Sequence, residues 1–139
     1  MIVRMAPEIT YVEAPQVTAA HLAALYDSSG IHRPTKDLPR LATMLAHANL
    51  IIAAYAGDRL VGIARALSDF SFCCYLSDLA VAKEFQRKGI GRELIRRVKL
   101  RAGEQSMLLL LSAPDAMEYY PRVGMEKVEN GWIIKRPGW

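Results

Sequence analysis

One short segment constrains the fold more than any other part of the sequence. An apolar stretch, residues 75–81, is followed by a polar loop that ends in Gln86-Arg87-Lys88-Gly89-Ile90-Gly91, and an amphipathic pattern then runs to about Glu104. Glycine lets the backbone approach a ligand closely, and the unpaired amides at the start of a helix favour an anion. The segment therefore predicts a strand, a loop that holds a phosphate or pyrophosphate, and a helix, in that order.

This loop differs from two common nucleotide-binding motifs. It lacks the Gly-x-x-x-x-Gly-Lys-Ser/Thr spacing of a P-loop and the three glycines of the dinucleotide fingerprint. The strands expected before it are joined by short turns, which makes them antiparallel, whereas a doubly wound nucleotide fold has parallel strands. The sequence therefore indicates a different phosphate carrier.

The hydrophobic pattern of the whole chain predicts an α+β fold. Two helices should begin at the capping residues Thr18 and Asp37, and another should run from Asp115 to about Val123. Strands are expected over residues 9–12, 50–55, 60–67, 72–81, 107–111, 125–129 and 132–136. The last two should form a closing hairpin around Asn130-Gly131, and 107–111, which follows a crossover helix, should be a parallel strand. We expect a mixed, mostly antiparallel sheet of six to seven strands flanked by about four helices, in a single domain, residues 1–139.

Composition agrees with such a domain. Of the 139 residues, 52% are hydrophobic, which suffices for a core without disulfides or metal. Cys73 and Cys74 are adjacent, too close for an ordinary disulfide, and indicate reduced thiols in a cytoplasmic protein. We expect no export signal and no membrane insertion, because the apolar runs are too short to span a bilayer. The net charge of +4 favours an anionic partner.

The hexapeptide at 86–91 resembles the signature Gln/Arg-x-x-Gly-x-Gly/Ala of the GNAT superfamily of acyl-coenzyme A dependent N-acetyltransferases. A second resemblance lies in Tyr119-Tyr120-Pro121-Arg122-Val123-Gly124-Met125, which parallels the family's Phe-Tyr-x-x-x-Gly-Phe. Tyr119 and Met125 replace phenylalanines and keep apolar bulk, whereas Pro121 departs from the pattern inside the expected helix. The order of elements agrees with the family from about Leu50 onward.

The resemblance implies a GNAT-like sheet that splays between the fourth and fifth strands and binds acetyl-coenzyme A there as co-substrate. In the family, amides of the glycine loop bind the pyrophosphate, and the pantetheine arm lies along the fourth strand. The corresponding residues here are Leu79, Ala80, Val81, Gln86, Arg87, Lys88, Gly89, Ile90, Gly91 and Arg92. No metal site is expected, because the three histidines lack ligand spacing.

The resemblance also implies direct attack of a primary amine on the thioester through a tetrahedral intermediate. A backbone amide near Leu79 is the candidate for stabilising the oxyanion, and Tyr120 is the candidate for protonating the leaving thiolate. An alkylamine of pKa about 10.4 must first lose a proton, which costs roughly 4.6 kcal/mol at pH 7. Asp78 is the first candidate for the base and Asp69 the second. A solvent-facing strand carboxylate or a cap is the alternative for Asp78, and a turn carboxylate for Asp69.

Three functions remain under consideration. The first is an N-acetyltransferase that acts on a primary amine of a small molecule or peptide. A homodimer is compatible with this function. The second is a non-catalytic acyl-coenzyme A sensor, and the third, less favoured, is nucleic-acid binding through the basic helix. Tyr26, His32, Arg33 and Trp132 are the candidate walls of the acceptor pocket, and packing is an equal alternative for Tyr26 and Trp132. An Arg33 that faces the cleft would favour an acceptor with a carboxylate.

Overall fold

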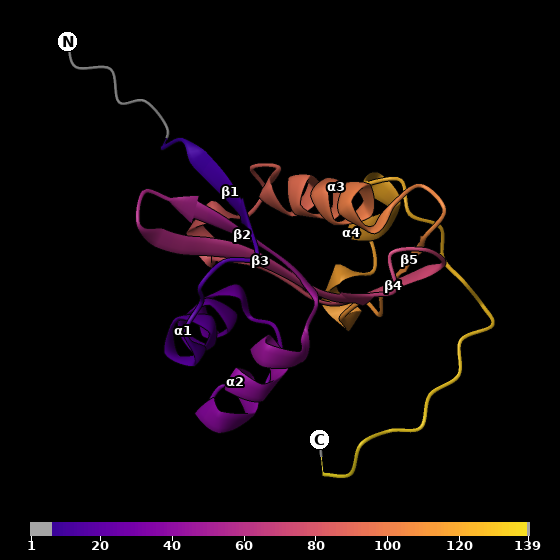
Figure 1. Ribbon diagram of the computed structural model, residues 1–139, viewed down its shortest axis with the longest axis horizontal. Helices are drawn as coiled ribbons and strands as arrows, with labels where there is room; N and C mark the ends of the chain where they lie inside the picture. The colour runs from indigo at the N-terminus through magenta and orange to yellow at the C-terminus, as the bar shows by residue number, and fades with distance from the viewer. Residues whose placement is uncertain (1–6, 139) are drawn as a thin grey trace.

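The computed structural model describes residues 7–138 (Figure 1). Its strands are β1 (Ile9–Glu13), β2 (Leu50–Ala56), β3 (Arg59–Ser68), β4 (Cys73–Val81) and β5 (Met107–Leu109). Its helices are α1 (Ala19–Ser29), α2 (Leu38–His47), α3 (Ile90–Ala102) and α4 (Tyr119–Arg122), and single 3-10 turns lie at Lys83–Phe85 and Pro114–Ala116.

The strands form one sheet in the order β1-β2-β3-β4-β5. The first four pair antiparallel, each with its neighbour in the chain, and β5 pairs parallel to β4 after the α3 crossover. The predicted mixed, mostly antiparallel sheet with four helices is confirmed. The expected number of six to seven strands is wrong, since the sheet of residues 7–138 has five.

The first two helices begin where the sequence predicted caps. The Thr18 Oγ1 accepts a hydrogen bond from the His21 N–H at 3.1 Å, and the Asp37 Oδ1 accepts one from the Arg40 N–H at 3.1 Å. Each bond satisfies an amide that has no partner within its helix. Gly30, with φ 84°, ends α1 in the left-handed conformation that glycine adopts at low cost.

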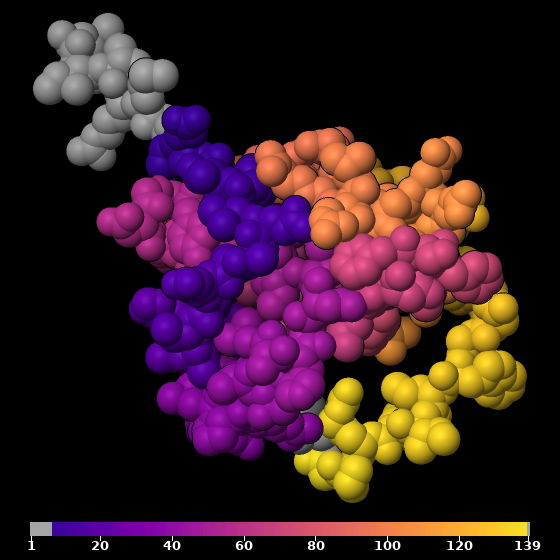
Figure 2. Space-filling model, in the orientation of Figure 1, coloured from indigo at the N-terminus to yellow at the C-terminus, as the bar shows by residue number. Residues whose placement is uncertain are grey.

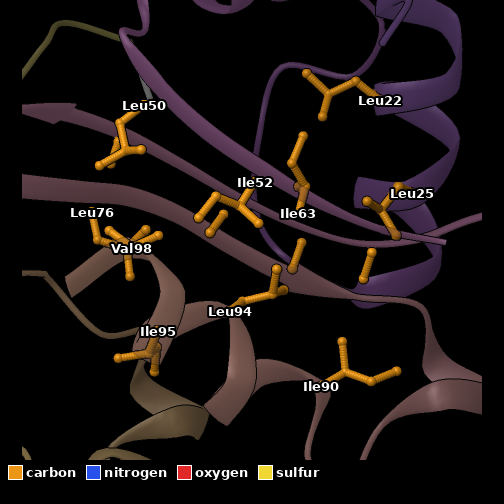
Figure 3. Close-up of a cluster of buried hydrophobic side chains, with 14 of the residues drawn as sticks. Leu22, Leu25, Leu50, Ile52, Ile63, Leu76, Ile90, Leu94, Ile95 and Val98 are labelled. Carbon is orange, nitrogen blue, oxygen red and sulfur yellow. The ribbon is translucent and has the colours of Figure 1, made fainter. Parts of the chain in front are cut away.

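Helices cover both faces of the sheet, with α3 on one face and α1 and α2 on the other (Figure 1). Figure 3 shows the buried side chains in three levels, from α1 through the sheet to α3: Leu22 and Leu25, then Ile52 and Ile63, then Ile90, Leu94, Ile95 and Val98. Each buried side chain of this kind contributes roughly 1.5–3 kcal/mol relative to an exposed one. None of the helices in the described part of the chain is both long and apolar enough to cross a membrane.

Gly62 of β3 sets how closely α3 approaches the sheet. A Cβ at this position would lie 3.1 Å from Ile90 Cγ2 and 3.3 Å from both Ala54 Cβ and Leu94 Cδ1. These neighbours are buried and leave little room for adjustment. Because Ile90 is the first residue of α3, the same contact fixes where that helix begins relative to the sheet.

The C-terminal segment corrects one expectation. Residues 125–136 contain no strand, so the predicted closing hairpin around Asn130-Gly131 is wrong. Trp132 is 97% exposed and Ile134 is 100% exposed. Figures 1 and 2 show the segment running away from α4 along the outside of the molecule. Two short strands are marginal without an adjoining sheet, and the nearest strand in the chain, β5, offers an edge of only three residues.

The helix expected over 115–123 is interrupted. It consists of the 3-10 turn Pro114–Ala116 and the separate helix α4. Pro121 has no N–H to donate to the carbonyl four residues earlier, so one continuous helix cannot form across Met117. Gly124, with φ 85°, follows α4 as the predicted stop.

We predict that Gly62→Ala lowers the free energy of unfolding by about 1–3 kcal/mol, because the added methyl overpacks the contact between β3 and α3. Urea titration followed by circular dichroism measures this loss. The control is Gly131→Ala, where a Cβ would meet no described atom within 4 Å and φ is not positive. A Gly62→Ala protein as stable as the control would contradict this account of the interface.

Candidate active site

A cleft opens where β4 and β5 separate. Within the described residues, the two strands pair only at Cys73–Tyr75 with Met107–Leu109. Beyond these pairs β4 continues to Val81, whereas the chain after β5 leads towards α4, and a cleft of about 1520 Å³ lies between the two. The sheet is therefore splayed between its fourth and fifth strands.

The open edge of β4 presents backbone groups to this cleft. The Ala82 N–H donates to the Val61 carbonyl of β3 at 2.8 Å, and backbone groups alternate between the two edges of a strand. The groups of Asp78 and Ala80 therefore point to β3, and those of Leu79 and Val81 point to the open edge. Gln86 Nε2 donates to the Val81 carbonyl at 2.9 Å. The Leu79 N–H and C=O and the Val81 N–H remain turned towards the cleft.

The loop before α3 has a left-handed backbone at two positions, Arg87 (φ 63°) and Gly89 (φ 85°). No described heavy atom lies within 4 Å of a Cβ placed at Gly89, so the space beside this residue is open. The free amides of the first turn of α3, together with the helix dipole, make this a favourable place for an anion. Arg92, the third residue of α3, adds a positive charge and donates from Nη2 to the Arg122 carbonyl at 2.8 Å.

At Gly91, in contrast, the position of a neighbouring side chain requires glycine. A Cβ at Gly91 would lie 2.6 Å from the Tyr119 hydroxyl, so the missing side chain makes room for α4. Sequence reasoning assigned this glycine to ligand approach. The structure shows that it also joins the loop to the tyrosine pair, whose rings meet edge to face with centroids 5.1 Å apart.

The cleft gathers nearly all of the residues predicted to bind the cofactor. Gln86 joins the loop to the rest of the molecule, since its Nε2 also donates to the Ser29 carbonyl at the end of α1 at 3.3 Å. Lys88 is the exception, because it does not line the cleft and its Nζ lies 5.4 Å from the centroid of the Phe85 ring. The residues that do line it are Leu79, Ala80, Val81, Gln86, Arg87, Gly89, Ile90, Gly91 and Arg92.

Tyr120 lines the same cleft and is partly buried. Burial raises the pKa of its hydroxyl, the neighbouring Tyr119 raises it further, and the charge of Arg33 lowers it. The net effect is a raised pKa, so the phenol keeps its proton throughout the neutral range. It is therefore suited to donating a proton and not to accepting one.

Asp78 lies at the centre of a buried polar cluster and has no exposed surface. Its Oδ1 accepts from Arg33 Nε at 2.6 Å, and its Oδ2 accepts from Arg65 Nε and from the Tyr26 hydroxyl, both at 2.5 Å. Burial raises the pKa of this carboxyl, but the hydrogen bond from Arg65 and the charges of both arginines outweigh it and hold the pKa below its usual value.

These contacts argue against the predicted role of Asp78 as general base. A carboxylate with a lowered pKa binds a proton weakly, and both of its oxygens are already engaged. The alternative of a solvent-facing carboxylate is wrong, because the side chain is buried. The contacts are those of a group that positions Arg33 and Arg65.

Sequence reasoning missed Arg65 and Ser77. Asp78 pairs with Arg65 and Leu76 with Ala66, so Ser77 is an extra residue in β4, a β-bulge. The Ser77 carbonyl accepts from Arg33 Nη2 at 2.7 Å, and its hydroxyl accepts from Arg65 Nη2 at 2.9 Å. A signal for Arg65 was present, because it is the single charged residue in the apolar run 60–67. A charge in such a position needs a buried partner.

Asp69 lies outside the cleft, in the turn between β3 and β4. Its Oδ1 accepts from the N–H groups of Ser71, Phe72 and Cys73 at 2.7–3.0 Å. These backbone hydrogen bonds lower the pKa of its carboxyl to about 2. The reading of Asp69 as a turn carboxylate agrees with this geometry.

The expected acceptor walls divide into two groups. His32 and Arg33 line the cleft, together with Arg40 and Met44 of α2. Tyr26 is fully buried, and its hydroxyl donates to Asp78. Trp132 projects from the C-terminal segment outside the cleft. Among residues 7–138, no three His, Cys, Asp or Glu side chains are grouped as metal ligands.

Comparison with known proteins agrees with this arrangement. The profile of the acetyltransferase (GNAT) domain family matches residues 23–133. The chain belongs to the GNAT acetyltransferase family. It is 32% identical, over 117 residues, to an uncharacterised N-acetyltransferase, ycf52, of Porphyra purpurea, and the match covers 79% of this chain and 66% of that protein. The chain thus spans slightly less than two thirds of this curated relative.

Solved GNAT structures share the fold. A GNAT-family acetyltransferase from Streptococcus pneumoniae superposes with a TM-score of 0.72 at 24% identity, over 93% of this chain and 100% of that one. An aminoglycoside N-acetyltransferase solved in complex with CoA superposes with a TM-score of 0.71 at 16% identity, over 98% and 99% of the two chains. At these identities the likeness concerns the fold.

We predict that Asp78→Asn lowers the free energy of unfolding at pH 7 by about 3–5 kcal/mol, because it leaves two arginines without their buried counter-charge. The pKa of Asp78 is lower in the folded than in the unfolded protein, so its contribution is fully present above the unfolded value of about 3.9. It is lost as the pH falls through the folded pKa.

Chemical denaturation of both proteins between neutral and acidic pH measures this difference. The difference in the free energy of unfolding between wild type and Asp78→Asn should become smaller as the pH falls. Asp58→Asn, at an exposed turn carboxylate, is the control and should follow the wild type. A gap that does not depend on pH would mean that the Asp78 charge is not the source of the stability.

Proposed function

We propose that this protein transfers an acetyl group from acetyl-coenzyme A to a primary amine of a small molecule or peptide. One observation carries the proposal. A single cleft brings together the unpaired edge of β4, the amides at the start of α3 and the hydroxyl of Tyr120. These are an extended surface, an anion site and a proton donor, which are the parts that transfer from a phosphorylated thioester needs.

The described residues fit coenzyme A. The left-handed backbone at Arg87 and Gly89 leaves open space beside the first turn of α3, where amides and the Arg92 charge face a pyrophosphate. The Leu79 and Val81 groups at the open edge of β4 supply hydrogen bonds for an extended amide chain, which would add to the sheet as a further strand. The bound co-substrate supplies an acetyl group activated as a thioester.

We assign the chemistry to two groups of this chain. The Leu79 N–H, which faces the cleft, donates to the oxygen on which negative charge develops. The Tyr120 phenol, kept protonated by its raised pKa, gives its proton to the departing sulfur. Asp78 positions Arg33 and Arg65 and does not take the amine proton, so that proton leaves by way of solvent in the open cleft.

The test is an assay of purified protein with acetyl-coenzyme A and a panel of primary amines, in which release of free thiol and acetylated product are both measured. Calorimetric titration with coenzyme A measures binding independently. Acetylated product together with coenzyme A binding supports the proposal. Coenzyme A binding without transfer to any amine would instead favour the acyl-coenzyme A sensor, and absence of binding would reject both functions.

We predict that Tyr120→Phe lowers kcat by about a hundredfold and leaves coenzyme A affinity unchanged, because only the proton donor is removed. The wild-type activity that depends on this proton should persist to at least about pH 10, since the folded pKa lies above that value. Steady-state kinetics across pH measures both effects. The control is Tyr55→Phe, whose hydroxyl lies outside the cleft. Equal kcat in Tyr120→Phe and wild type would remove this hydroxyl from the mechanism.

A further inference from the structure

The walls of the cleft carry a large excess of positive charge. Among residues 7–138, seven arginines line it, against two carboxylates, Asp115 and Glu118. Part of this excess has a role in the proposed function, because Arg87 and Arg92 flank the loop that faces the phosphates of coenzyme A. A second group, which consists of Arg33, Arg40 and Arg65, lies farther along β4, beside Ser77 and α2.

The second group is only partly neutralised. In the described part of the chain, Asp78 is the one carboxylate bonded to Arg33 and Arg65, so within that part the pair keeps one net positive charge. Towards the described residues Arg33 uses three of its five N–H donors, one each to Asp78 and to the carbonyls of His32 and Ser77. Its side chain is 26% exposed. The guanidinium is thus fixed in position by the protein while retaining donors and charge for a ligand in the cleft.

Arg65, on β3, adds its positive charge to this site. Its side chain is 9% exposed, and one of its bonds, from Nη1 to the Met44 carbonyl, is long at 3.4 Å. Arg40, on α2 one turn before Met44, is exposed and also lines the cleft. A buried net charge is costly unless a counter-ion arrives, and a carboxylate fits the planar fork of an arginine.

This group lies next to the proposed reaction centre. Arg33 is near enough to Tyr120 for its charge to lower the pKa of the Tyr120 hydroxyl, against the larger effect of burial. Ser77 and Asp78, which hold Arg33, immediately precede Leu79 in β4. An acceptor whose amine reaches the Leu79 and Tyr120 groups therefore has Arg33 within the length of a small molecule.

We propose, on the basis of the proposed acetyltransferase function, that the acceptor is an amine that also carries a carboxylate, which binds to Arg33 with Arg65 and Arg40 around it. Amino acids, or peptides with an acidic side chain near the reacting amine, are the class that fits. Polycationic amines are disfavoured, because a second ammonium group would meet this uncompensated positive charge.

The experiment compares three matched sets of acceptors that differ only at the end away from the reacting amine: ω-amino acids of graded chain length, their amides and the corresponding diamines. For the wild type, kcat/KM should be about tenfold higher for the best amino acid than for its amide, and lowest for the diamine. Arg33→Gln and Arg40→Gln should each reduce the preference of amino acid over amide, with unchanged coenzyme A affinity. Arg40→Gln is informative even if Arg33→Gln fails to fold, because Arg40 is exposed. Arg101→Gln, at an arginine ion-paired with Glu13 outside the cleft, should keep the preference.

Two results would overturn the inference: a wild-type preference for amides or diamines, or a preference for amino acids that neither cleft variant reduces. Failure of the proposed function is distinguishable from both. If coenzyme A binds and no acceptor is acetylated, calorimetric titration of the coenzyme A complex with N-acetylated ω-amino acids and with their amides decides. Tighter binding of the acids, weakened by Arg40→Gln, supports the anion site, and equal binding rejects it.

Discussion

The buried carboxylate of Asp78 is the interaction on which the arrangement of the cleft depends. It joins four parts of the chain that are distant in sequence: α1 through Tyr26, the loop after α1 through Arg33, β3 through Arg65, and β4 itself. Replacing such a group by an apolar side chain would leave charged partners buried, and removing one partner is costly for the same reason. The network thus fixes the wall of the cleft with a geometry that apolar packing alone would specify less sharply.

The second constraint is that β4 has a partner on one side only along most of its length. Three residues of β5 form the parallel pair, and the remaining edge of β4 faces the cleft. An exposed strand edge is normally a liability. In this protein it lies within a cleft walled by α4 and the loop before α3, where under the proposed function the unpaired backbone groups serve as a binding surface.

Much of this could be predicted from sequence where the signal was local. Thr18 and Asp37 cap their helices because a cap needs only a few neighbouring residues, and Gln86-Arg87-Lys88-Gly89-Ile90-Gly91 folds as a loop and helix start for the same reason. The closing hairpin failed because strand pairing depends on an available edge, which the Asn130-Gly131 turn signal does not report. The burial of Asp78 was not predicted because its partners come from three other segments of the chain, and only the unexplained arginine in the apolar run of β3 pointed to them.

The order of the strands has a consequence for how the protein folds. The pairs β2–β3 and β3–β4 join strands that are adjacent in the chain, and each needs only a short turn to close. The two outer pairs are different, since α1 and α2 lie between β1 and β2, and α3 must be in place before β5 can align with β4. Contacts between distant residues close slowly and against a larger entropy cost. The half of the cleft made by β5 and α4 is therefore expected to assemble after the hairpins of β2, β3 and β4 and to open before them.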